Sequence, residues 1–282
     1  MQVSDSVHSC LELQVQLALA SQSITARGLA LYTAAPNKYA RMNALPFPAY
    51  IPALSEDLKT PEFSTMLASA SHLYGQASQD LAPPELEALR QRFFEAVWQT
   101  ASAQTWFPQE GGHAHRVARN AAALALRLGY SDLEAHEIYW GGLLHDIGKL
   151  FVGELFVALV DQGLPIETTL PFIRTHASLG GDFLKSVQPL FSTALLCAAQ
   201  HQESVDGSGY PDGLRYEQLA LPGQIVNLAD GYDATITRFG WSASQINADI
   251  QGMYARAGYS QAPIVQAFIQ LVGECHAEWY PP

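Results

Sequence analysis

The chain is poor in cysteine and in charged residues. Three cysteines occur in 282 residues, at Cys10, Cys197 and Cys275, and no two of them have a CxxC spacing. This pattern excludes a fold built on a disulfide framework and is typical of free thiols in a reducing compartment. Only 15% of the residues are charged and 48% are hydrophobic, which excludes an intrinsically disordered chain.

Basic residues are the scarcest charged type. There are 15 Lys and Arg against 27 Asp and Glu, so the formal net charge is −12, and we expect neither a nucleic-acid polymer nor a membrane as a partner. No apolar run is long enough to span a bilayer, and the N-terminus does not begin as a signal peptide does. The sequence predicts a soluble, cytoplasmic protein whose anionic substrates would need a local positive site, such as bound metal ions.

Strand-like alternation and internal repeats are also missing, whereas apolar residues recur at helical spacing along most of the chain. The fold class predicted is therefore all-α. We place a boundary near residue 100, between an N-terminal helical regulatory or dimerisation domain (1–100) and a second domain (101–282). The helices expected are 7–35, 61–79, 83–105, 113–128, 131–146, 150–160, 168–187, 189–202, 222–237, 243–256 and 261–279.

The most informative stretch is 141–149, where an apolar helix ends in the pair His145-Asp146 and Lys149 follows one turn later. Charged groups at the end of an apolar run are costly unless they are paired or bound to metal. Neighbours on a helix point about 100° apart, so His145 and Asp146 can bind one metal ion from two directions. Asp146 can also bind a second ion. The alternative is an ordinary helix C-terminus with a packed histidine.

Four further residues extend this pattern along the chain, each on its own predicted helix: His113, His176, His201 and Asp230. Histidine and carboxylate ligands suit iron, manganese or zinc. Helical bundles build metal centres when facing helices each present one such ligand. A glycine-rich loop, 206–213, follows His201 and cannot be helical.

Together these residues resemble the HD-GYP family, a branch of the HD metal-dependent phosphohydrolases, over about half of the chain (residues 105–240). The matching positions are His113, His145-Asp146-Ile147-Gly148-Lys149, His176, His201-x-Glu203-x-x-Asp206-Gly207-x-Gly209-Tyr210-Pro211 and Asp230.

The resemblance implies an HD-type helical bundle that follows the small N-terminal domain. It implies a metal-dependent phosphodiesterase that hydrolyses cyclic di-GMP to linear pGpG, to GMP or to both, in bacterial signalling. Two divalent metal ions, iron or manganese, are the cofactors expected. The Gly-Tyr-Pro loop is a candidate contact for a partner signalling protein, and a homodimer is compatible with the resemblance.

It also implies roles for individual residues. One metal would be bound by His113, His145, Asp146 and Asp230, and the second by Asp146, His176 and His201. Asp146 and Lys149 would be catalytic. The residues expected to bind substrate are Lys149, Asp206, Gly209, Tyr210 and Arg238.

Three positions depart from the family pattern. Gln202 stands where a second histidine is usual, and Gln109 stands where three-metal members carry a glutamate, so both are weak ligands at most. The usual Arg-Pro-Tyr motif is replaced by 237–241, which leaves Arg238 as the candidate cation. Two alternatives therefore stay open. One is a phosphohydrolase for another nucleotide or cyclic dinucleotide, and the other is a protein that binds a nucleotide or a partner without hydrolysis.

Overall fold

The computed structural model describes residues 3–38, 51–106, 111–259 and 262–279, and these segments contain helices and no strand, which confirms the all-α class. The N-terminal helices are α1 (Val3–Ala34), α3 (Ile51–Leu58), α4 (Pro61–Ala70), the π-helical turn η1 (Ser71–Gln76) and α5 (Pro83–Ser102). The helices that follow are α6 (Gly111–Arg127), α7 (Asp132–Leu144), α8 (Lys149–Asp161), α9 (Ile166–Arg174), α10 (His176–Ser186), α11 (Ser192–Gln200), the 3₁₀ turn η3 (Tyr216–Gln218), α12 (Leu221–Phe239), α13 (Ala243–Arg256) and α14 (Pro263–Trp279).

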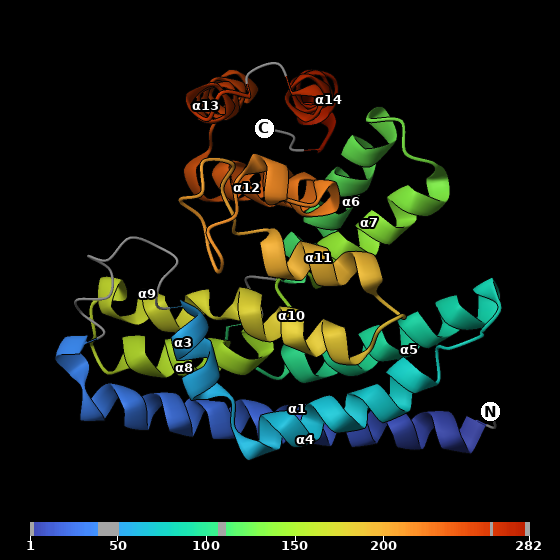
Figure 1. The fold of residues 1–282 in the computed structure, drawn as a ribbon, viewed down its shortest axis with the longest axis vertical. Coiled ribbons are helices and arrows are strands. Elements are labelled where there is room, and N and C mark those ends of the chain that lie inside the picture. Colours follow the sequence, from blue (N-terminus) through green and yellow to red (C-terminus); the bar gives the residue numbers. More distant parts are fainter. Residues whose placement is uncertain (1–2, 39–50, 107–110, 260–261, 280–282) are drawn as a thin grey trace.

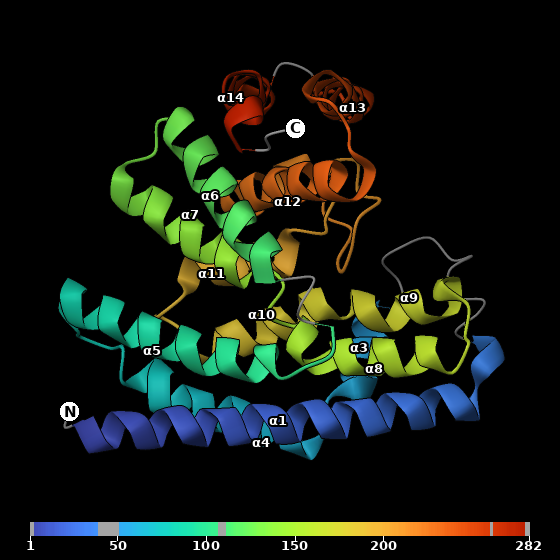
Figure 2. The same cartoon turned by 180° about the vertical axis from the view of Figure 1, so that it is seen from behind.

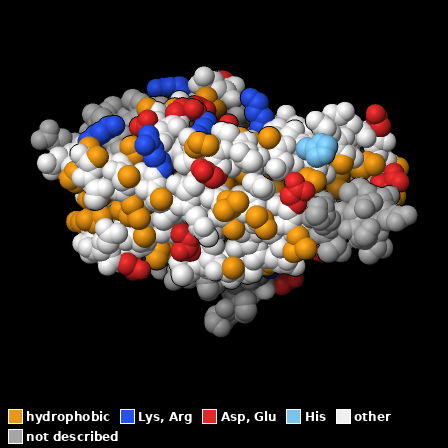
Figure 3. Space-filling model, turned by 90° about the horizontal axis from the view of Figure 1, so that it is seen from below, with side chains coloured by type: hydrophobic (Ala, Val, Ile, Leu, Met, Phe, Trp, Pro, Cys, Tyr) orange, Lys and Arg blue, Asp and Glu red, His pale blue; other side chains and the backbone are white. Residues whose placement is uncertain are grey.

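The helices form stacked layers, with α1 and α4 at one end of the molecule and α13 and α14 at the other (Figure 1). Viewed from behind, α6, α7 and α12 lie between α13–α14 and the layer that contains α5, α8 and α10 (Figure 2). On the face seen from below, hydrophobic side chains are scattered among acidic and uncharged ones (Figure 3). No helix in the described part of the chain is both long and apolar enough to cross a membrane.

Two hydrophobic cores lie inside these layers. The first joins residues of the N-terminal helices, such as Phe63 and Phe93, to Phe151 of α8 and Phe183 of α10. The second joins α6, α7 and α11 to α12–α14, with Phe268 of α14 fully enclosed. The first core thus runs across residue 100, and the domain division there stays a prediction.

Local sequence explains where the helices around the cores begin and end. The expected capping box opens α7, since the backbone N–H of Ser131 donates to Glu134 at 2.8 Å and the Ser131 hydroxyl accepts from the Glu134 N–H. Gly129, with φ +90°, follows the end of α6 as predicted. The three cysteines are unpaired, as expected, and the cytoplasmic location stays a prediction.

The single helix predicted over 168–187 is wrong. The structure has two helices there, α9 and α10, with Thr175 between them. The Thr175 hydroxyl donates to the carbonyl of Phe172 at 2.6 Å, and its N–H donates to the same carbonyl. Local bonds of this kind compete with the regular helical ladder. The break makes His176 the first residue of α10.

Candidate metal centre

The predicted ligands meet where the two cores adjoin, and they come from five segments of the bundle. Helix α6 supplies His113, the turn after α7 supplies His145 and Asp146, α10 supplies His176, the turn after α11 supplies His201, and α12 supplies Asp230.

A close helix contact at Gly148 brings two of these segments together. A Cβ atom on Gly148 would lie 1.9 Å from the carbonyl oxygen of His176, so only glycine lets the start of α8 lie against α10. As a result, Nε2 of His176 lies 3.2 Å from Oδ1 of Asp146. The glycine of the His-Asp-x-Gly-Lys motif is therefore needed for packing.

Three of the histidines are oriented by backbone carbonyl groups. Nδ1 of His145 lies 2.8 Å from the carbonyl oxygen of Gly142. Nδ1 of His176 lies 2.6 Å from that of Ile173, and Nδ1 of His201 lies 3.0 Å from that of Ala198. A carbonyl oxygen only accepts hydrogen bonds, so Nδ1 carries the proton in each ring. In the neutral ring, Nε2 is then left with a lone pair for a ligand.

The three Nε2 atoms converge on Asp146. Their distances to its carboxylate oxygens are 3.1 Å from His145, 3.2 Å from His176 and 3.4 Å from His201. Nε2 of His176 and Nε2 of His201 are 3.1 Å apart. Nε2 of His145 and Oδ1 of Asp146 are buried without a hydrogen-bond partner. Lone pairs that face one another in this way are stabilised by a cation, so the donor set fits a metal ion.

His113 is held by side chains instead. Its Nε2 lies 3.1 Å from Oδ1 of Asp230, and its Nδ1 lies 2.6 Å from Oδ2 of the fully buried Asp233. Arg116 donates to both oxygens of Asp233, at 2.6 and 3.0 Å. Carboxylates behind a ligating histidine fix its orientation and raise its basicity. Sequence reasoning missed Asp233 and Arg116, although Asp233 lies three residues after Asp230 and thus on the same helix face.

The pKa shifts differ within the site. Burial would lower the pKa of His113, but the carboxylates of Asp230 and Asp233 outweigh it and raise the pKa to about 10. Burial would raise the pKa of Asp146, yet the charges of Lys149 and His145 hold that pKa well below its ordinary value. Burial lowers the pKa of His201, which keeps this ring neutral and able to act as a ligand.

Two groups of potential ligands result, and they share one residue. His113, His145 and Asp230 form the first group, and His145, Asp146 and His201 form the second. Within each group the ligand atoms lie within 4.8 Å of one another. His176 contacts two members of the second group through Nε2. The described residues therefore contain candidate metal-binding groups at the predicted place.

Lys149 lies beside this cluster and shares a cleft with Arg238. Nζ of Lys149 is 2.6 Å from Oδ2 of Asp146. Both cations line a cleft of about 570 Å³ between α8, α9 and α12, together with Trp106 and Phe156. The remaining wall consists of Thr105, Asp161 and five apolar residues: Gly153, Val157, Val160, Leu170 and Ile173. The structure thus brings the two predicted cations to one cleft next to the histidines.

The loop that follows His201 is organised by Glu203, which the motif contains but which was given no role. Its buried carboxylate accepts hydrogen bonds from the backbone N–H groups of Asp212, Gly213 and Leu214, at 2.7, 3.1 and 2.9 Å. Burial raises the pKa of Glu203. Asn227 of α12 donates to the carbonyl groups of His201 and Glu203 and fastens the start of the loop.

Two predicted substrate contacts also shape this loop. The carboxylate of Asp206 accepts from the N–H and the hydroxyl of Ser208. A Cβ atom on Gly209 would lie 2.2 Å from the backbone nitrogen of Ser204, so Gly209 allows close backbone packing. Substrate binding by Asp206, Gly209 and Tyr210 stays a prediction. Gln109 lies outside the described residues.

Comparison with known proteins agrees with this geometry. Residues 100–259, more than half of the chain, match the family model described as HD domain. The chain belongs to the HD domain family. The family relationship predicted from the motifs is thereby confirmed.

Two curated relatives of this HD domain protein are named phosphodiesterases. One, a cyclic di-GMP phosphodiesterase from Thermotoga maritima, is 28% identical over 57% of this chain and 44% of its own length. Another, the 3′3′-cGAMP-specific phosphodiesterase 3 from Vibrio cholerae, is 34% identical over 45% of this chain and 27% of its own length. The chain thus spans less than half the length of these relatives. A solved structure, Bd1817, an HDG"Y"P protein from Bdellovibrio bacteriovorus, aligns with TM-score 0.48 and 16% identity over 92% of this chain and 78% of its own.

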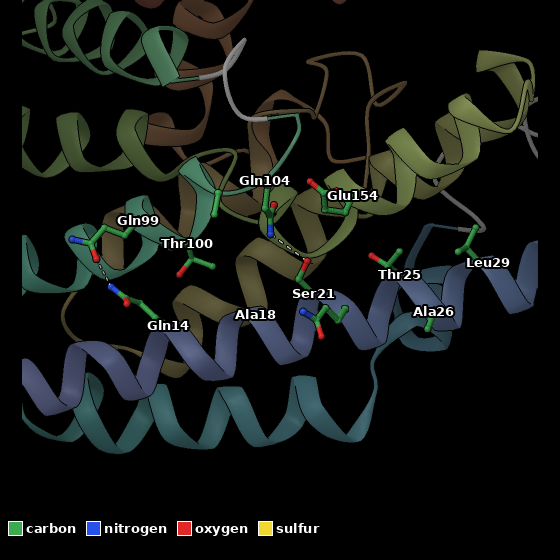
Figure 4. Close-up of a pocket in the computed structure, with 12 residues that line it drawn as sticks. Gln14, Ala18, Ser21, Thr25, Ala26, Leu29, Gln99, Thr100, Gln104 and Glu154 are labelled. Carbon is green, nitrogen blue, oxygen red and sulfur yellow. Dashed lines mark hydrogen bonds between the residues drawn. The ribbon is translucent and has the colours of Figure 1, made fainter.

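A second cavity lies mostly outside the matched HD domain. This groove of about 830 Å³ is lined by α1 and α5, with Glu154 of α8 (Figure 4). Amide and hydroxyl groups face one another across it, for example Gln14 and Gln99, which are hydrogen-bonded at 2.5 Å. Gln104 donates to the Ser21 hydroxyl and to the carbonyl of Leu150, in the first turn of α8. The groove therefore contacts the helix that carries Lys149, and it contains none of the predicted ligands.

Proposed function

We propose that the protein is a metal-dependent phosphodiesterase that hydrolyses cyclic di-GMP to linear pGpG, to GMP or to both. The observation that carries this proposal is the pair of ligand groups that share His145, with the Asp146 carboxylate among three imidazole Nε2 atoms. Such a constellation is the protein part of a two-metal hydrolytic centre. The named activities of the relatives support it.

Two divalent cations, iron or manganese, are the cofactors that we propose. Four histidines with carboxylates from Asp146 and Asp230 form a nitrogen and oxygen donor set, which suits these metals. We assign His113, His145, Asp146 and Asp230 to one ion and Asp146, His176 and His201 to the other. When bound, divalent cations polarise a phosphate oxygen and activate water for attack on phosphorus.

The chain's own residues would bind and orient the substrate. Lys149 lies against the ligand cluster and lines the cleft, so it is placed to hold a phosphate oxygen and to stabilise the charge that develops there. Arg238 provides a second cation in the same cleft. The aromatic side chains of Trp106 and Phe156 offer surfaces for a nucleobase. A cleft of about 570 Å³ is within the size range of ligand sites.

The names of the relatives suggest which bases the substrate carries. One relative is named for cyclic di-GMP and the other for 3′3′-cGAMP, so both nucleotides are candidate substrates. A partner protein at the Gly-Tyr-Pro loop and a homodimer stay predictions.

The test combines metal analysis and turnover on one sample of anaerobically purified protein. We expect about two iron or manganese ions per chain, hydrolysis of bis(p-nitrophenyl) phosphate, and linear product from cyclic di-GMP. A panel of cyclic di-GMP, 3′3′-cGAMP and cyclic di-AMP then ranks the substrates. Bound metal and activity on bis(p-nitrophenyl) phosphate alone would indicate another phosphodiester. Protein without metal after reconstitution with both ions would overturn the hydrolase and leave a binding protein.

A further inference from the structure

Gln202 lies between the Gly-Tyr-Pro loop and a predicted metal ligand. The Tyr210 hydroxyl donates to Oε1 of Gln202 at 2.9 Å, and Nε2 of Gln202 donates to Oδ2 of Asp230 at 3.2 Å. The orientation of the amide is fixed by its partners, because the ionised Asp230 carboxylate can only accept a hydrogen bond. Both polar atoms of the Gln202 side chain therefore have protein partners, and neither needs a metal ion.

These hydrogen bonds give the two oxygens of the Asp230 carboxylate different partners. Oδ2 accepts from Gln202, whereas Oδ1 lies 3.1 Å from Nε2 of His113 and 4.0 Å from Nε2 of His145. A carboxylate that is free to rotate could present either oxygen, or both, to the histidines. Gln202 removes this freedom and leaves Oδ1 as the oxygen that faces the ligand group.

Tyr210 connects this arrangement to the substrate cleft. The guanidinium of Arg174 lies 5.6 Å from the centre of the Tyr210 ring, and the His176 ring contacts it edge-on at 6.3 Å between centres. Arg174 ends α9, the helix that supplies Leu170 and Ile173 to the cleft. One chain of contacts thus runs from the cleft wall through Tyr210 and Gln202 to Asp230.

We propose that Gln202 is a positioning residue for the metal ligand Asp230, linked by Tyr210 to the wall of the substrate cleft, and that it is not itself a ligand. This inference rests on the metal centre of the proposed function. It assigns a role to the position where the family pattern has a histidine. An amide can donate to a carboxylate and accept from a tyrosine at the same time. A neutral imidazole at this place could not bind a metal and also keep both hydrogen bonds.

The substitution Gln202→Glu separates a positioning role from a ligand role, because the two roles predict opposite changes in Mn²⁺ affinity. The new carboxylate can still accept from Tyr210, but it cannot donate to Asp230 and repels it. We expect the affinity for Mn²⁺ of at least one site to fall about 10- to 100-fold, as for other residues that support a ligand. A carboxylate binds divalent cations better than an amide, so equal or tighter Mn²⁺ binding would overturn the inference.

Mn²⁺ affinity is measured by competition with a chromophoric chelator on the full chain, and chemical unfolding of the metal-free protein is followed in parallel. The matched control is Gln251→Glu, the same change at an exposed position of α13, which we expect to leave both readouts unchanged. Tyr210→Phe removes only the hydroxyl and should weaken Mn²⁺ binding about 2- to 10-fold. Unchanged binding in that variant would overturn the link to the loop.

The outcomes also separate this inference from the proposed function. If the wild-type protein binds no Mn²⁺, the metal centre and the inference both fail. If the wild type binds Mn²⁺ and turns over its substrate while Gln202→Glu binds equally well or better, only the inference fails. A fall in Mn²⁺ affinity that exceeds, in free energy, any loss of stability of the metal-free protein supports positioning, and a loss of stability that accounts for the whole fall would overturn it.

Discussion

The two sides of the candidate metal centre are oriented by different groups. On one side, His113 and Asp230 are oriented by other side chains, namely Asp233 and Gln202. On the other side, three histidines are oriented by backbone carbonyl groups of the preceding helical turn. The backbone-held side is fixed by the helices themselves, so its orientation depends on how the helices pack. The side-chain-held side can be altered by one mutation, so this is where affinity can be tuned.

Asp146, to which we assign contacts with both ions, gives the largest expected effect. Replacing it in Asp146→Asn removes the carboxylate that His145, His176 and His201 approach and that Lys149 contacts. We expect bound metal to be lost and turnover to fall about 1,000-fold or more, since metal assistance is worth several kcal/mol. Metal analysis and turnover of cyclic di-GMP check this, with Asp249→Asn at an exposed position of α13 as the control. Retained metal and activity would mean that Asp146 is not a bridging ligand.

Asp233→Asn tests the side-chain-held side alone. The amide keeps the shape of the carboxylate but lowers the basicity of His113 and weakens the two bonds from Arg116. We expect one of two metal ions to bind about 10- to 100-fold more weakly, and the other to be unaffected. Titration with Mn²⁺ resolves the two sites. If both weaken equally, the two sides do not act independently.

Gly148→Ala tests the backbone-held side through packing. The added Cβ would meet the carbonyl of His176 and push α8 from α10, which we expect to lower the free energy of unfolding by about 1–3 kcal/mol. The substitution should also lower the affinity for the ion assigned to His176 and His201 more than the affinity for the ion assigned to His113. Gly273→Ala on α14 is the control, because a Cβ there meets no atom within 4 Å. Chemical unfolding and Mn²⁺ titration measure both effects, and equal unfolding curves for the two variants would contradict the packing argument.

The pH dependence of the stability of the metal-free protein tests the side-chain-held side, and it is the smallest effect that we expect. The pKa of His113 is about 10 in the folded protein against an ordinary value of 6.5, so its stabilising contribution is complete below pH 6.5 and disappears as pH rises through 10. Between pH 7 and 8 we expect the free energy of unfolding to fall by at most about 1.4 kcal/mol. Unfolding in the presence of a chelator measures this, and His113→Asn should flatten the curve. Metal binding must displace this proton, so Mn²⁺ affinity should rise over the same interval.

The residues that meet at the candidate metal centre could be predicted from sequence, whereas most of the residues that orient them could not. His113, His145, Asp146, His176, His201 and Asp230 were found because metal chemistry restricts residue types and the motif fixes their order. Asp233 and Asn227 escaped because hydrogen-bond partners far apart in the chain leave no periodic signal. Asp233 had one local indication, its spacing of three from Asp230. The turn at Thr175 was missed because the apolar spacing continues through it, while the local hydrogen bonds from Thr175 to Phe172 leave no periodic signal.

The approach of α1 to α8 has a mechanical consequence. A Cβ atom on Gly28 would lie 2.2 Å from a methyl group of Leu155, so the two helices touch almost backbone to side chain. Helix α1 is 32 residues long, about 48 Å, and spans the width of the molecule. This long helix packs against α8, the helix whose first residue is Lys149. Because α1 and α8 are in direct contact at Gly28, we expect a displacement of α1 to move α8 and with it Lys149.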